Sequence, residues 1–293
     1  MRIIQILYYA YLNTENLFRS IFGYNIINNF LTHESSDIKI KNCNFRDLIL
    51  FIHSIFFINL PFYCPYWLPK NLQLILFGEK SKYIPDKNEL DNENNCFLFI
   101  NGILGNEKHI YNNKKELEKL LNRPINVIYN SSHTLLGDLI ESLIGKETEN
   151  LTEASLTALE IVTNKLMNKN INKVILICYS QGTIITSKVL FMLNKLGINE
   201  KNIMKKLEIY CFSNCSSKMN YIINNYPYME HFANENDFIA KLGCNCPVEI
   251  KKLISIDGSI FINKKGNGHL LNLHYLQNFS QNFPFSKLNN YIQ

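Results

Sequence analysis

The sequence predicts an α/β fold, in which a mainly parallel sheet is covered by helices on both faces. Short apolar segments alternate with helical patterns from about residue 96 onward, as strands and helices do in parallel sheets. Segment 174–178 is entirely apolar, which is typical of a strand buried on both faces. The chain has 293 residues, of which 46% are hydrophobic, so it is long enough to bury a full core.

The expected elements follow one another in the order that such a sheet requires. Apolar segments predict strands at 96–100, 125–130, 174–178, 206–214 and 229–234. Amphipathic patterns predict helices at 114–121, 154–169 and 184–197, the last of them ended by Gly197. Segment 253–263 predicts a β-hairpin that turns at Asp257-Gly258.

The first third of the chain differs from the rest in composition and pattern. Residues 1–90 are rich in Ile, Leu, Phe and Tyr, and we expect a mostly helical N-terminal extension, separate from a catalytic domain at 91–293. Within it, 48–69 is the most apolar segment, but prolines break any helix beyond residue 60, which leaves too little to span a bilayer. Two interpretations stay open: a helix buried against the core, or a lid or interfacial segment that contacts lipid.

Composition argues against several classes of function. The net charge of +5 is mild, and the lysines form no dense basic stripe, so we expect no nucleic-acid partner. The eight cysteines fit free thiols in a reducing, cytoplasmic compartment, and the N-terminus lacks a signal-peptide cleavage site. A zinc site is not expected, because the C-x-C spacing of one candidate pair departs from the usual knuckle. Its ligands would be Cys211, Cys215, Cys244 and Cys246.

Ser180 lies where the apolar segment 174–178 meets a helical pattern, and this is the arrangement of a nucleophile elbow. The usual pattern is G-x-S-x-G. Gly182 supplies the second glycine, whereas Cys178 replaces the first, at a position that requires a small side chain. Alone, the motif is weak and fits a small residue at a buried strand-to-helix turn better than a nucleophile, so the hypothesis needs partners for the serine.

Such partners follow in the chain order serine, acid, histidine. Asp237 comes just past the predicted strand 229–234, and His269 follows two glycines and precedes a helical pattern. A flexible glycine loop can deliver a general base to the carboxyl edge of the sheet. Helix capping is the alternative role for both residues. Three other residues are rivals for the acid and the base. Asp257 fits a turn better, and His231 and His274 fit positions in the core better.

An acyl-transfer site also needs donors for a developing oxyanion. The backbone N–H of Gln181, directly after the serine, is one candidate. The other is the backbone N–H of Ile103, in the loop that follows the strand at 96–100. Asn101-Gly102 in that loop otherwise indicates only a turn.

Residues 96–280 resemble the α/β-hydrolase superfamily, and more closely a lipase-like group found in fungi and chlamydiae. The matching stretches are FINGILGN, VIYNSSHTLLGDLIES, ILICYSQGTII, EHFANENDFIAKLG and GNGHLLNLHYL. The resemblance implies Ser180 as nucleophile, Asp237 as acid and His269 as base. It departs at Cys178 and at Tyr179, where histidine is common. It also places HTLLGD, a short acyltransferase-like pattern, in a loop.

Together these features predict a serine hydrolase that cleaves a carboxylic ester with a Ser-His-Asp triad and needs no metal or cofactor. The apolar N-terminal third suggests a lipid-like ester, and segment 48–69 a peripheral contact with a membrane. The alternative is a catalytically inactive binding protein on an α/β-hydrolase fold, if the altered elbow misplaces the serine. A membrane-bound structural protein is a third option.

Overall fold

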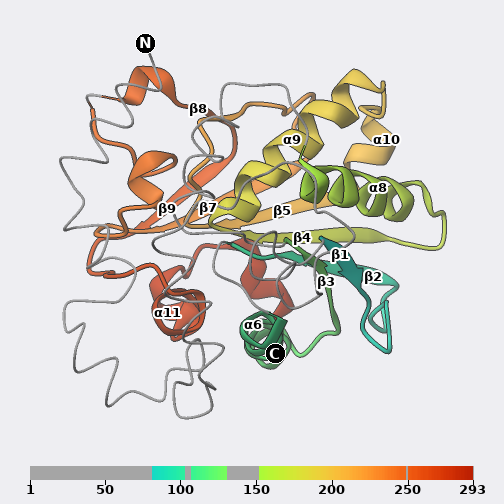
Figure 1. The fold of residues 1–293 in the computed structure, drawn as a ribbon, viewed down its shortest axis with the longest axis horizontal. Helices are drawn as coiled ribbons and strands as arrows, with labels where there is room; N and C mark the ends of the chain where they lie inside the picture. Colours follow the sequence, from blue (N-terminus) through green and yellow to red (C-terminus); the bar gives the residue numbers. More distant parts are fainter. Residues whose placement is uncertain (1–80, 103–106, 131–151, 249, 293) are drawn as a thin grey trace, which may run out of the picture.

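The computed structural model describes residues 81–102, 107–130, 152–248 and 250–292. These residues form a seven-stranded sheet in the order β1-β3-β2-β4-β5-β7-β9 (Figure 1). Strand β1 runs antiparallel to β3, and every other pair in this sheet is parallel. The predicted fold class, a mainly parallel sheet with helices on both faces, is confirmed.

The bounds of β2, β3, β4, β5 and β7 match the predicted apolar segments closely. The strands are β1 (Lys82–Ile84), β2 (Asn95–Ile100), β3 (Ile125–Tyr129), β4 (Lys173–Tyr179), β5 (Leu207–Phe212), β7 (Tyr228–Asn234) and β9 (Ser259–Asn263). The α-helices are α6 (Glu107–Leu121), α8 (Glu153–Met167), α9 (Gln181–Lys195), α10 (Lys201–Met204) and α11 (Phe279–Asn282). Short 3-10 segments are η2 (Ala240–Leu242), η3 (Lys251–Leu253) and η5 (Lys287–Tyr291), and η4 (Leu271–Leu276) is π-helical.

Each face of the sheet has its own apolar core. In β2, Cys96, Leu98 and Ile100 face helices α8 and α9, whereas Phe97 and Phe99 face the core formed with α6, η4 and α11. Successive side chains of a strand point to opposite faces, so a strand covered on both sides must be apolar throughout. Figure 1 shows α8, α9 and α10 on one side of the sheet and α6 and α11 on the other. The two cores hold the strand ends in fixed positions.

The predicted hairpin at 253–263 is wrong. Strand β8 (Ser255–Ile256) pairs with β6 (Lys218–Met219) in a separate two-stranded sheet, whereas β9 pairs with β7 in the main sheet. Gly258 links the two sheets at φ +95°, where a Cβ would lie 2.5 Å from the carbonyl oxygen of Met229. The Asp-Gly pair therefore marks a crossing point between sheets, where only glycine fits the backbone.

Strand β1 was not predicted. It forms one edge of the main sheet by pairing with β3, and it lies within the segment assigned from sequence to the N-terminal extension. The boundary at residue 90 stays a prediction. Among the described helices, none is long and apolar enough to cross a membrane. Segment 48–69 lies outside the described residues.

Candidate active site

Ser180 occupies a sharp turn between the end of β4 and the start of α9. Its backbone has φ 54° and ψ −122°, a conformation that costs a non-glycine residue on the order of 1–3 kcal/mol. Three hydrogen bonds hold it there. The Ser180 N–H donates to the carbonyl oxygen of Phe212 at 2.9 Å, and the Ser180 carbonyl accepts from the N–H and the hydroxyl of Thr183. The turn is thus the strained, supported elbow that the sequence predicts.

Two small residues allow the chain to pass so closely at this turn. A Cβ at Gly182 would lie 2.5 Å from the carbonyl oxygen of Ile100, so α9 crosses directly over the end of β2. Cys178 is fully buried in the core under α9, and its Sγ lies 3.3 Å from the Sγ of Cys211 on the neighbouring strand. Cysteine is therefore accommodated where the usual motif has glycine.

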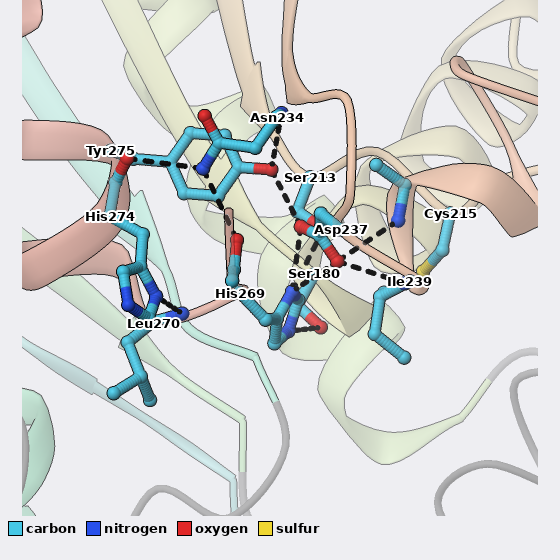
Figure 2. A network of polar contacts seen from close by, with 12 residues as sticks. Ser180, Ser213, Cys215, Asn234, Asp237, Ile239, His269, Leu270, His274 and Tyr275 are labelled. Carbon is cyan, nitrogen blue, oxygen red and sulfur yellow. Dashed lines mark hydrogen bonds and ion pairs between the residues drawn. The ribbon is translucent and has the colours of Figure 1, made fainter. Parts of the chain in front are cut away.

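The three residues predicted for catalysis lie together in one hydrogen-bonded chain (Figure 2). His269 Nε2 lies 3.0 Å from Ser180 Oγ, and His269 Nδ1 lies 3.0 Å and 3.2 Å from the two carboxylate oxygens of Asp237. All three side chains are buried. Ser180 and Asp237 follow β4 and β7, whose carboxyl ends share one edge of the sheet, and this explains why residues so distant in sequence meet.

Asp237 makes the contacts that both roles left open by the sequence require. Its Oδ1 accepts from the N–H of Ile239 at 2.9 Å and so caps the turn that leads into η2, while Oδ2 faces His269. Burial raises the pKa of this carboxyl, but the positive charge of a protonated His269 and hydrogen bonds from His269, Ser213 and Tyr275 lower it below its usual value. The carboxylate is therefore ionised at neutral pH.

A glycine-containing loop carries His269, as predicted. Gly268 has φ +84°, and a Cβ there would lie 2.3 Å from the ring of His274. The side-chain amide of Asn234 donates to the carbonyl oxygens of Gly268 and His274, at 3.2 Å and 3.1 Å. The end of β7 thus holds the histidine loop from both sides of His269.

The rival histidines occupy structural positions. His274 Nδ1 accepts from the N–H of Leu270, while His231 bonds to Asn214 and to the carbonyl oxygen of Asp257. Burial lowers the pKa of both histidines to about 4, although nearby aspartates act in the opposite direction, so both are neutral near pH 7. His269 is the histidine that reaches Ser180.

Two residues, Tyr179 and Ser213, make contacts with His269 that were not predicted from sequence. The Tyr179 ring stacks on the imidazole, with ring centroids 4.9 Å apart and an interplanar angle of 28°, and its hydroxyl donates to the His269 carbonyl at 2.8 Å. Ser213, which follows β5 at φ 51°, places its Oγ 3.0 Å from His269 Nδ1. The departure from the common histidine at position 179 marked the residue in the sequence, but not its contacts.

The structure describes one of the two candidate oxyanion donors, Gln181. Gln181 is the first residue of α9, and the first N–H groups of a helix have no partner within that helix. Its side chain accepts a hydrogen bond from the side-chain amide of Asn130 at 2.6 Å. Gly102 approaches Ser180 so closely that a Cβ there would lie 2.8 Å from the serine Cβ. Ile103 lies outside the described residues.

Asn101 holds this end of β2 against β3. Its side chain accepts from the N–H of Asn130 at 2.8 Å and donates to the Asn130 carbonyl at 2.9 Å, so it extends the strand pairing by one residue. In the described part of the chain, no group of three or more His, Cys, Asp or Glu residues could hold a metal ion. None of the cysteines described there, including the four weighed as zinc ligands, forms a disulfide.

A mainly parallel sheet with a strained serine turn between a central strand and the following helix is the α/β-hydrolase fold. No family model matches the chain, and no curated protein matches it. The resemblance to a lipase-like group in fungi and chlamydiae therefore stays a prediction.

Several solved structures are similar to this chain at low identity. One is a lipase-esterase related protein from Clostridium acetobutylicum, at 14% identity and a TM-score of 0.43, covering 73% of this chain and 100% of that one. Est1E from Butyrivibrio proteoclasticus has 12% identity and a TM-score of 0.36, with coverage of 69% and 95%. A hyperthermophilic esterase from Pyrobaculum calidifontis has 10% identity and a TM-score of 0.39, with coverage of 77% and 82%. These likenesses say nothing about activity.

Proposed function

We propose that the protein is a serine hydrolase that cleaves a carboxylic ester through an acyl-enzyme. The observation that carries the proposal is the unbroken chain of hydrogen bonds from Ser180 Oγ through His269 to Asp237, at a strained turn. A serine is a weak nucleophile by itself, and an adjacent base that is oriented by a third group activates it. Backbone strain of the kind found at Ser180 is concentrated at active sites.

In the proposed reaction, each group of the site has a role. Ser180 Oγ attacks the ester carbonyl carbon while His269 Nε2 takes the serine proton, and the N–H of Gln181 helps to stabilise the oxyanion. His269 then gives that proton to the departing alcohol, which leaves an acyl group on Ser180. Water, deprotonated by His269, attacks the acyl carbon; the bond to Ser180 Oγ then breaks, the acid leaves, and His269 returns the proton to the serine. Asp237 keeps the imidazole in the correct tautomer and stabilises the imidazolium.

A lipid-like ester is the substrate class that we propose, and the support for it is compositional. The N-terminal third is strongly apolar, and segment 48–69 could cover an active site or lie on a lipid surface. A cytoplasmic enzyme with peripheral membrane contact would fit this composition. Flotation of the full chain with liposomes, compared with a variant carrying charged substitutions in 48–69, tests the membrane contact.

Turnover of p-nitrophenyl esters from acetate to palmitate tests the proposal. We expect Ser180→Ala to lower kcat by about 10⁴-fold or more, because the covalent route is lost. Ser155→Ala, at a buried serine on α8 outside the site, is the matched control and should retain kcat. Equal turnover by wild type and Ser180→Ala would overturn the proposal. Much faster turnover of short than of long esters would contradict the lipid-like substrate class, but not the proposed hydrolase activity.

The alternative of a catalytically inactive binding protein depended on a misplaced serine. The 3.0 Å distance from Ser180 Oγ to His269 Nε2 gives no support to such a displacement. In the same assay, a folded wild-type protein without Ser180-dependent turnover of any ester would favour binding without catalysis.

A further inference from the structure

Tyr275 brings a hydroxyl group to the acid of the site. The residue lies in η4, on the segment that follows His269, and its side chain is completely buried with its ring edge-on to Phe212. Figure 2 shows the hydroxyl between Asn234 and Asp237. The backbone nitrogen of Asn234 is 3.1 Å from the hydroxyl oxygen, and Asp237 Oδ2 is 2.6 Å from it.

The direction of these two hydrogen bonds follows from chemistry alone. A backbone N–H can only donate, so the tyrosine oxygen accepts from Asn234 and directs its own proton to Asp237. Burial raises the pKa of Tyr275 well above its usual value, so the hydroxyl keeps that proton. A distance of 2.6 Å is typical of a hydroxyl donating to an ionised carboxylate, which is among the stronger hydrogen bonds in proteins.

The two oxygens of Asp237 are therefore held by different elements. Oδ1 accepts from the N–H of Ile239, and Oδ2 accepts from Tyr275. A carboxylate held at both oxygens cannot rotate about its Cβ–Cγ bond, and its plane is fixed toward His269 Nδ1. Ser213 also bonds to this carboxyl, but without the tyrosine hydroxyl Oδ2 would lose its hydrogen bond from η4, and the carboxylate would resist that rotation less.

We propose that Tyr275 is a positioning residue for the candidate triad: its hydroxyl fixes the Asp237 carboxylate in the orientation that holds His269. The inference rests on the proposed function, because it concerns the same site. Tyr275 and His269 belong to one segment, which Asn234 also holds by its side-chain amide. The acid is thus attached to the segment that carries the base, so any shift of the histidine loop takes Asp237 with it.

Other titratable groups also surround the carboxylate. They are His269, His274, Cys244 and Tyr275 itself. Burial is the first cause of the lowered pKa of His274 and the raised pKa of the Cys244 thiol, so both are neutral near pH 7. Tyr275 is therefore, like Ser213, a neutral side chain that donates a hydrogen bond to Asp237 next to the histidine.

Tyr275→Phe tests the inference, because it removes the hydroxyl and keeps the buried ring. Tyr210→Phe is the matched control. Tyr210 is equally buried, and its hydroxyl donates to the carboxylate of Glu208 at 2.8 Å, near the start of β5 and away from the carboxyl edge of the sheet. We expect both variants to lower Tm, but only Tyr275→Phe to lower kcat, by about tenfold, with KM within about twofold of wild type.

The outcomes separate the inference from the proposed function. Ser180-dependent turnover that Tyr275→Phe reduces no more than Tyr210→Phe does would overturn the inference alone. Absence of Ser180-dependent turnover in the wild type would overturn the proposed function, and the inference with it.

If Tyr275→Phe does not fold, difluorotyrosine incorporated at position 275 provides a second variant. It retains the ring and the hydroxyl, but makes the hydroxyl a stronger donor to Asp237. We expect a changed kcat for this replacement at 275 and an unchanged kcat for the same replacement at 210. Equal kcat values for the two would contradict the positioning role.

Discussion

Gly182 has no Cβ, and its absence allows the turn at Ser180 to form. A Cβ there would lie 2.5 Å and 2.9 Å from the carbonyl oxygens of Ile100 and Asn101. Gly182→Ala must therefore displace α9 or the end of β2, and Ser180 with it. We expect the free energy of unfolding, measured in urea, to fall by about 3 kcal/mol, and turnover to be lost.

Gly197→Ala is the control for this prediction. Gly197 has φ +72° with nothing within 4 Å of the position of an added Cβ, so the change tests backbone strain without a clash. We expect a loss of about 1 kcal/mol and full activity. If Gly182→Ala costs no more than Gly197→Ala, α9 does not pass as closely over β2 as described.

Tyr179 contacts His269 both through its ring and through its hydroxyl. Tyr179→Phe keeps the stack and loses one hydrogen bond, and we expect kcat to fall by about threefold. Tyr179→Leu loses both contacts and leaves the imidazole less constrained, and we expect a fall of about thirtyfold. Steady-state kinetics of the two variants measure the difference. Equal kcat values for the two would show that the stack does not orient the histidine.

The candidate site could be located from sequence because its main residues carry local signals. Ser180 lies at the junction of an apolar segment and a helix, Asp237 just past a strand, and His269 after two glycines. The contacts of Tyr179 and Tyr275 had no such signal. Where a buried hydroxyl points depends on packing between elements far apart in the chain, and a sequence pattern does not record that.

At the scale of elements, Glu230 holds the C-terminal segment to the sheet. This side chain of β7 is completely buried and accepts from the hydroxyls of Tyr228 and Ser286 and from the N–H of Lys287. Glu230→Gln would keep one acceptor oxygen and replace the other by an amide NH2 group, which cannot accept from the donor that faces it. We expect the free energy of unfolding to fall by about 3 kcal/mol, with kcat of the folded protein unchanged.

Urea unfolding measures this prediction, and Glu235→Gln is its control. Glu235 undergoes the same change of charge at an exposed position just past β7, and we expect a change below about 0.5 kcal/mol. Similar midpoints for the two variants would show that the contacts of Glu230 do not secure the C-terminal segment.

The success of sequence prediction at this scale depended on whether the signal was local. Helix α8 could be predicted from its apolar stripe, and Thr152 caps it by accepting from the N–H of Ser155. The false hairpin arose because Asp257-Gly258 specifies a bend but not the partners of the strands on either side. Strand β8 pairs with β6 and β9 pairs with β7, and this pairing depends on tertiary contacts, not on the local sequence.

At the scale of the whole molecule, stability should depend on pH through its buried histidines. Burial lowers the pKa of His231 and of His274 to about 4, against about 6.5 in an unfolded chain. Between these values the unfolded chain binds more protons, so their contribution is complete above about pH 6.5 and is lost as the pH falls toward 4. We expect His231 alone to account for about 3 kcal/mol.

Urea unfolding at pH 7.5, 5.5 and 4.5 follows this loss. The His231→Gln variant, which cannot titrate, should show a smaller decrease over the same range than wild type, although it starts from a lower stability. An identical dependence on pH for wild type and His231→Gln would show that His231 does not carry the effect.

The central claim is that Ser180 is an activated nucleophile, and covalent labelling tests it most directly. The wild-type protein would be treated with a fluorophosphonate, digested, and analysed by mass spectrometry for the modified peptide. The hydrogen bonds of Ser180, His269 and Asp237 predict a single adduct on Ser180, with no labelling of Ser180→Ala and strongly reduced labelling of His269→Ala. An unlabelled but folded wild type, or equal labelling of Ser180→Ala, would contradict it.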